Sequence, residues 1–141
     1  AVSELIEACR DMSADKTGAL IVIPGQNSLQ DIIATGDVVD AKVNSRLIRN
    51  IFFKNSPLHD GAMILSGERI IAARCTLPMT SKEDLPPSFG MRHKAAIGIS
   101  EASDAQVILI SEESGHIAYC KGGEITIINN INELRPLIST K

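Results

Sequence analysis

Three consecutive potential cations, Arg92, His93 and Lys94, stand at the start of a stretch typical of a helix, residues 91–102. The first turn of a helix is already electropositive, because its N–H groups are free and the helix dipole points there. Adding positive charge at that point conflicts with the local electrostatics. The conflict disappears if an anion such as a polyphosphate binds there. A basic turn exposed to water is the alternative.

A second polar segment, His-Asp-Gly-Ala at 59–62, precedes a predicted strand. Gly61 lets the backbone approach a ligand closely or take a positive φ. His59 beside Asp60 suits a metal ligand next to a carboxylate. A plain Asp-Gly turn with His59 exposed is the alternative.

The third segment, Ser-Glu-Glu at 111–113, follows an apolar run at 106–110. The carboxylates of Glu112 and Glu113 at a strand end can hold a divalent cation through oxygen ligands. A charged turn is the alternative here, and we expect His116 to be a surface residue.

The apolar pattern predicts the elements that position these segments. Short apolar runs predict strands, at 18–23, 38–42, 62–65, 69–74, 106–110, 116–120 and 124–128. Apolar residues at helical spacing predict helices, at 1–12, 28–33 with Ser28 as its cap, 44–54, 91–102 and 131–138. The residues 77–90 between them read as a surface loop. The predicted fold class is α/β (α+β mixed), a central mixed β-sheet of about six or seven strands flanked by helices, in a single domain of residues 1–141.

Composition narrows the classes of function. A net charge of −3 argues against a nucleic-acid polymer as partner, but not against a single nucleotide. The three cysteines have no metal-like spacing, and we expect small buried side chains in a reducing compartment. The chain has no Walker loop, no Gly-x-Gly-x-x-Gly and no Gly-x-Ser-x-Gly. It carries no apolar run long enough for a membrane helix and no signal peptide, and it begins without Met, so we expect a piece of a longer protein.

Taken together, the segments resemble the diadenylate cyclase domain family. The resemblance rests on Leu-His-Asp-Gly-Ala at 58–62, Ala-x-x-x-Leu-Pro at 73–78, Arg-His-Lys-Ala-Ala-Ile-Gly-Ile-Ser-Glu at 92–101 and Ser-Glu-Glu-Ser-Gly at 111–115. It extends over about residues 18–128 and is strongest to the membrane-anchored cyclases. It implies a soluble catalytic domain from a bacterial protein whose missing N-terminal segment would place it at the cytoplasmic side of the cell membrane.

The resemblance also implies an activity, in which two ATP molecules become cyclic di-AMP, a second messenger, and two pyrophosphates. Each 3′-hydroxyl would attack the other ATP's α-phosphate across a face-to-face dimer of two copies of the chain. The resemblance assigns the attacking hydroxyl to Asp60 and the triphosphate to Arg92, His93 and Lys94. It assigns further ATP contacts to Gly61, Ala62, Leu77, Met91, Ser111 and Glu112, and a divalent metal, Mg²⁺ or Mn²⁺, to His59 and Glu113.

Three positions depart from the family pattern. Lys94 stands where the family has Arg, which keeps the charge but loses the bidentate fork. Met91 replaces a threonine hydroxyl, and Thr76 replaces an aromatic residue that could stack on adenine. These departures motivate an alternative function, a nucleotide-binding regulatory module with weak or no turnover.

Overall fold

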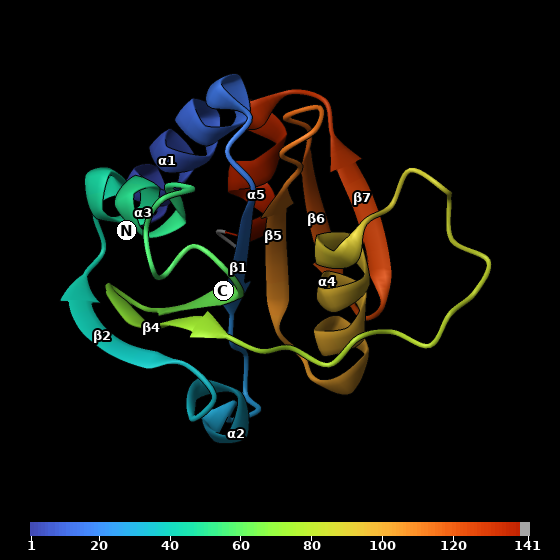
Figure 1. Cartoon of the computed structure of the whole chain (residues 1–141), viewed down its shortest axis with the longest axis horizontal. Helices are drawn as coiled ribbons and strands as arrows, with labels where there is room; N and C mark the ends of the chain where they lie inside the picture. The colour runs from blue at the N-terminus through green and yellow to red at the C-terminus, as the bar shows by residue number, and fades with distance from the viewer. Residues whose placement is uncertain (139–141) are drawn as a thin grey trace.

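A seven-stranded sheet forms the centre of the computed structural model, which describes residues 1–138 (Figure 1). The strands are β1 (Ala19–Ile23), β2 (Asp37–Lys42), β3 (Ala62–Ser66), β4 (Arg69–Cys75), β5 (Gln106–Ile110), β6 (Ile117–Lys121) and β7 (Glu124–Ile128). Their order across the sheet is β2-β4-β3-β1-β5-β6-β7. Strands β1 and β3 run parallel, and the other neighbouring pairs in this described sheet are antiparallel. The predicted mixed sheet and its two hairpins, β3–β4 and β6–β7, are confirmed.

Within residues 1–138, five helices flank the sheet: α1 (Val2–Asp15), α2 (Gln30–Ile33), α3 (Ser45–Phe52), α4 (Met91–Ala102) and α5 (Leu134–Ile138), with a short 3-10 turn η1 (Ile131–Glu133) before the last. None of those in the described part of the chain combines the length and the apolar character needed to span a membrane.

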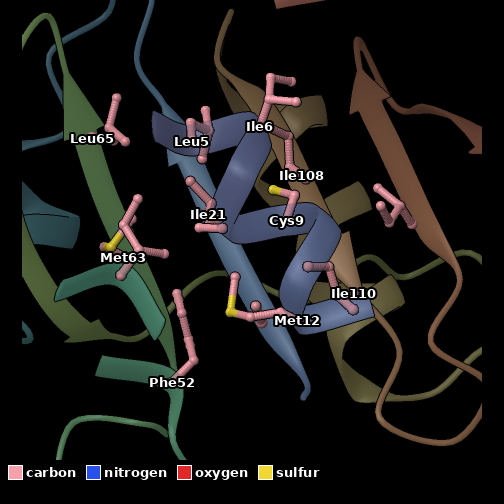
Figure 2. Close-up of a cluster of buried hydrophobic side chains, with 14 of the residues drawn as sticks. Leu5, Ile6, Cys9, Met12, Ile21, Phe52, Met63, Leu65, Ile108 and Ile110 are labelled. Atoms are coloured by element: carbon pink, nitrogen blue, oxygen red, sulfur yellow. The ribbon is translucent and has the colours of Figure 1, made fainter. Parts of the chain in front are cut away.

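One face of the sheet is covered by α1, with α3 and α5 beside it (Figure 1). Figure 2 shows Leu5, Cys9 and Met12 of α1 pointing toward Ile21 of β1 and Ile108 of β5. The spacing of three and four residues along α1 places these side chains on one helix face. Each large apolar side chain buried in this way contributes about 1.5–3 kcal/mol of transfer free energy. Cys9 is part of this layer, and burial raises the pKa of its thiol to about 12.

The opposite face is covered by α4, which packs on Leu20 and Val22 of β1 and on Val107 and Leu109 of β5. Successive residues of a strand point to opposite faces, so the fully apolar runs that make up β1 and β5 supply both cores. The loop after β4 crosses α4 at Gly98, where any side chain would collide with the backbone of Pro78. This crossing ties the beginning of the 77–90 loop to the helix.

Two local predictions differ from the structure. Ser28 does not cap α2, which begins after Leu29 without a side-chain cap, so the prediction of that cap was wrong. The neighbouring N–H groups of Gln26 and Asn27 bond instead to the Asp104 carboxylate, which holds this segment against the turn after α4. The predicted helix 131–138 is divided, because Glu133 accepts hydrogen bonds from the N–H groups of Asn129 and Asn130 and tightens its first turn.

Candidate functional site

The segments singled out by their chemistry meet at one end of the sheet. Strand β1 lies between β3 and β5, parallel to the first and antiparallel to the second. The starts of β1 and β3 and the end of β5 therefore lie at the same end of the sheet. The end of β4 joins them, because Ala62 pairs with Cys75. Residues 59–61, 76–77 and 111–113 are brought together by this topology.

A cavity of about 370 Å³ lies at this end of the sheet. Its volume falls in the range of about 300–1,000 Å³ that is usual for small-molecule sites. Six of the predicted site residues line it, namely Asp60, Gly61, Leu77, Met91, Arg92 and Glu112. The predicted convergence of the three segments is therefore present, with the side chain of Asp60 exposed and accessible.

The turn that leads into β3 requires a glycine at position 61. Its φ is +91°, in the left-handed region that side chains disfavour. A Cβ at this position would also lie 2.6 Å from the carbonyl oxygen of Cys75. Gly61 thus lets the chain turn into β3 close against the end of β4 and leaves Asp60 at the wall of the cavity.

Arg92 is the cation that faces the site. Its Nη1 lies 3.2 Å from Oε1 of Glu112, and the two side chains are 26% and 66% exposed. Both residues also line two neighbouring cavities, one of about 440 Å³ with His59 and one of about 210 Å³ with His93 and Glu113. The Arg92–Glu112 pair therefore stands where three cavities meet.

His93 is held inside the protein rather than presented to solvent. Its side chain is 4% exposed and stacks on Phe89 with ring centroids 4.4 Å apart. Nδ1 accepts a hydrogen bond from the N–H of Gly90, and Nε2 lies 3.1 Å from Nε2 of His116. Burial and the neighbouring His116 lower the pKa of His93. A neutral imidazole with both nitrogens engaged serves to position the start of α4.

The remaining predicted residues lie around this centre in different settings. Lys94 is exposed on α4, and Met91 is 71% exposed. Ala62 is buried at the start of β3. The Ser111 hydroxyl oxygen accepts hydrogen bonds from the N–H groups of Glu113 and Ser114, which shapes the turn that carries Glu112.

The predicted metal ligands do not form a preassembled centre. Nδ1 of His59 donates a hydrogen bond to the carbonyl oxygen of Ser56, which leaves Nε2 of His59 without a bond in the described contacts. His59 and Glu113 line different cavities on either side of the Arg92–Glu112 pair. Within residues 1–138, no group of three or more His, Cys, Asp or Glu side chains is arranged to hold a metal ion. These donors alone do not fit a closed metal site.

Two residues at this site were not found from the sequence. His116 was expected at the surface, whereas it is half-buried against His93, and its Nδ1 lies 2.7 Å from the Ser114 hydroxyl. Gly18 lies directly against the guanidinium of Arg92. Both contacts depend on which strands are neighbours in the sheet, and spacing along one chain does not reveal that order.

Known proteins are similar to this chain in sequence, and solved structures are similar to it in fold. Cyclic di-AMP synthase CdaA from Bacillus subtilis is 40% identical over 124 residues, which cover 88% of this chain and 45% of that protein. A diadenylate cyclase from Listeria monocytogenes gives the same identity and coverage. The crystal structure of a double mutant of DacA from Staphylococcus aureus superposes with a TM-score of 0.96 at 37% identity, covering 99% of this chain and 93% of that one.

The chain spans less than half the length of the Bacillus and Listeria relatives. The family model described as DAC, DisA bacterial checkpoint controller nucleotide-binding, matches residues 6–125. That range contains every segment that forms the cavity edge, and it is most of the chain. The protein therefore belongs to the DAC family of nucleotide-binding domains.

Proposed function

We propose that this chain is the catalytic domain of a diadenylate cyclase, which condenses two ATP molecules into cyclic di-AMP and two pyrophosphates. The observation that carries the proposal is that Asp60 and Arg92 line the same cavity at one end of the sheet. A carboxylate that can take a proton and a guanidinium that can bind phosphate are the two groups that the reaction needs. The names of the relatives from Bacillus and Listeria support the same activity.

In the proposed reaction, Asp60 accepts the proton of a ribose 3′-hydroxyl. The 3′-oxygen forms a bond to the α-phosphorus of a second ATP, the bond from that phosphorus to the bridging β-oxygen breaks, and pyrophosphate leaves. Arg92 stabilises the negative charge that develops on the transferred phosphoryl group. The 3′-hydroxyl of the second ATP then attacks the α-phosphorus of the first in the same way, and this second transfer closes the ring.

The other predicted residues take supporting parts in this proposal. Leu77, which is buried at the cavity, and the backbone beside it would hold adenine. Gly61 and Ala62 would bring the chain close to the nucleotide, while Met91, Ser111 and Glu112 would border it. Lys94 would add positive charge near the triphosphate. His93 would act by fixing the start of α4, since its ring is buried and both nitrogens are engaged.

Two copies of the chain are needed in this scheme, because each brings one Asp60 and one Arg92 to one cavity while the product contains two equivalent bonds. Met79 and Met91 border the cavity and are 42% and 71% exposed. Exposed apolar side chains at the mouth of a site are the kind of surface that a facing copy would cover.

We also propose that a divalent metal ion, Mg²⁺ or Mn²⁺, arrives with the ATP phosphates, with His59 and Glu113 as ligands from the chain. No step of the proposed reaction depends on this metal ion, since the described donors do not form a closed site. In the full-length protein we propose an N-terminal membrane anchor. A solved relative from Bacillus cereus, 38% identical with a TM-score of 0.87, is described as a hypothetical membrane spanning protein.

The decisive experiment incubates the protein with ATP and either Mn²⁺ or Mg²⁺ and separates the products by chromatography. We expect cyclic di-AMP and pyrophosphate in a ratio of one to two. The alternative function, a nucleotide-binding regulatory module, predicts ATP binding without product even at high protein concentration. That result would reject the cyclase in favour of the module.

A further inference from the structure

The guanidinium of Arg92 rests directly on Gly18, the residue that precedes β1. Gly18 is buried, and an added Cβ would lie 2.5 Å from Cζ, 2.6 Å from Nη1 and 2.7 Å from Nη2 of Arg92. Ordinary contacts of a Cβ are about a full ångström longer, because carbon atoms pack at about 3.5–4.0 Å. The flat guanidinium can occupy this position only because residue 18 has no side chain.

The need for glycine here does not come from the backbone. Gly18 is absent from the residues with positive φ, unlike Gly61 at the other side of the cavity. An alanine could therefore adopt the same backbone conformation. What the glycine supplies is space for one particular side chain, and that side chain is the cation at the centre of the site.

We infer that Gly18 is a positioning residue, which sets the depth of the Arg92 guanidinium between the cavity that contains Asp60 and the cavity that contains His59. This inference rests on the proposed function, in which Arg92 binds the transferred phosphoryl group. Gly18 forms the floor below the guanidinium, and Glu112 holds its Nη1 from the side. Together they give a long, flexible side chain a single location before ATP binds.

The Gly18→Ala substitution is expected to displace the guanidinium by about 1 Å toward the cavity without unfolding the protein, because the displaced group is the end of a flexible side chain. A misplacement of about 1 Å at a catalytic group can cost about 100-fold in rate. We expect kcat to fall between about 10-fold and 100-fold, with a smaller change in KM, since charge attraction to ATP survives the displacement.

The chain offers a matched control at the other end of β1. Gly25 also lies under a charged group, with its added Cβ 2.6 Å from Cγ and 2.7 Å from both carboxylate oxygens of Asp104. Gly25 likewise has no positive φ. The Gly25→Ala substitution repeats the same steric change away from the cavity, and we expect its kcat and KM to stay within two-fold of wild type.

A second background tests whether Gly18 acts through Arg92. The Arg92→Lys substitution keeps the charge but removes the planar fork that packs on Gly18. In that background, adding Gly18→Ala is expected to change kcat by less than two-fold. Equal losses from Gly18→Ala in both backgrounds would overturn the inference, as would an unchanged kcat in Gly18→Ala alone or an equal loss in Gly25→Ala.

Thermal unfolding and ATP affinity, measured by calorimetry, separate the possible failures. We expect Gly18→Ala to unfold within a few degrees of wild type, and a large drop in unfolding temperature would overturn the positioning role. If wild type binds ATP without forming product, the proposed cyclase fails and the inference fails with it, whereas an active wild type whose Gly18→Ala variant keeps its kcat overturns the inference alone. A wild-type protein that binds no ATP overturns both.

Discussion

Asp60 is the residue on which the proposed chemistry depends most directly. It lies exposed at the cavity wall, with Gly61 turning the backbone behind it. In the Asp60→Asn variant the group keeps its size but can no longer accept a proton at neutral pH. A general base contributes about 100-fold to 10,000-fold in rate, so we expect kcat to fall by that factor. ATP affinity, measured by calorimetry, should stay within about three-fold, because the side chain makes no phosphate contact in the proposed reaction.

Asp31→Asn provides the control for this substitution, since Asp31 is an exposed carboxylate on α2 that lines none of the cavities at the site. Its kcat should match that of wild type. Loss of ATP binding in Asp60→Asn to the same extent as kcat would contradict the role of Asp60 as proton acceptor.

The three adjacent cations show what a sequence can and cannot distinguish. The unusual charge at the start of a helix indicated an anion site, and Arg92 does lie at a cavity. The family resemblance assigned the triphosphate to all three side chains, whereas the helix points them in different directions. Neighbouring residues on a helix lie on different faces, so Arg92 meets Glu112, His93 enters the core and Lys94 faces solvent. Which direction meets the sheet depends on packing beyond the helix itself.

Among the elements, α4 and the turn after β5 are joined through His93 and His116. Nδ1 of His93 accepts from Gly90, so its Nε2 carries the proton that is donated to His116. Protonation of His93 would place a hydrogen on Nδ1, which could then no longer accept the hydrogen bond from Gly90. Neutral His93 therefore keeps both of its ring contacts, to Gly90 and to His116, and these join the helix that carries Arg92 to the turn that carries Glu112.

The pH dependence of stability should reveal this connection. Burial and His116 lower the pKa of His93 below its usual value of 6.5 in the folded protein. The unfolded chain then binds the proton more tightly, so the contribution of His93 is complete above about pH 6.5 and declines as the pH falls through the lowered pKa. We expect the unfolding temperature of wild type to fall more steeply between about pH 7 and pH 5 than that of His93→Asn.

The asparagine in His93→Asn can still accept the hydrogen bond from Gly90 but does not titrate. All the carboxylates are common to the two proteins, so their effect on the slopes cancels. The variant should be less stable at pH 7, by about 1–3 kcal/mol, because it loses the ring stacking and the bond to His116. Parallel curves of unfolding temperature against pH would contradict the neutral His93 inferred from the structure.

The elements were predicted best where their apolar pattern is uninterrupted. Strand β5 and helix α4 have the predicted bounds, 106–110 and 91–102, because a short run buried on both faces and a stretch of small residues leave few other conformations. The end of α2 at Ile33 was predicted, but its start and cap were not, since the segment before it is held by Asp104, a residue far along the chain. The order of the strands was not predicted either, and this order places Gly18 beside Arg92.

For the molecule as a whole, the arrangement of the site has a consequence for assembly. The cavity that Asp60 lines lies at one end of the sheet, and Asp60 is exposed to solvent there. One chain supplies a single set of groups, whereas cyclic di-AMP requires two equivalent transfers. A second copy must bring its own ATP to face the first, so the active species in the proposed function is a symmetric pair with matching surfaces.

A symmetric pair makes the specific activity depend on protein concentration. When monomers predominate, the concentration of pairs rises with the square of the protein concentration, so the rate per molecule should rise in proportion to concentration and then level off as pairs saturate. The measurement is the initial rate of cyclic di-AMP formation over a dilution series, with the dimer fraction followed in parallel by sedimentation. An equal mixture of Asp60→Asn and wild type gives a further test of the pair. A mixed pair can complete only one of the two bonds. Random pairing should therefore leave about a quarter of the pairs fully competent. A rate per molecule that stays constant at dilutions where sedimentation shows only monomers would reject the facing arrangement.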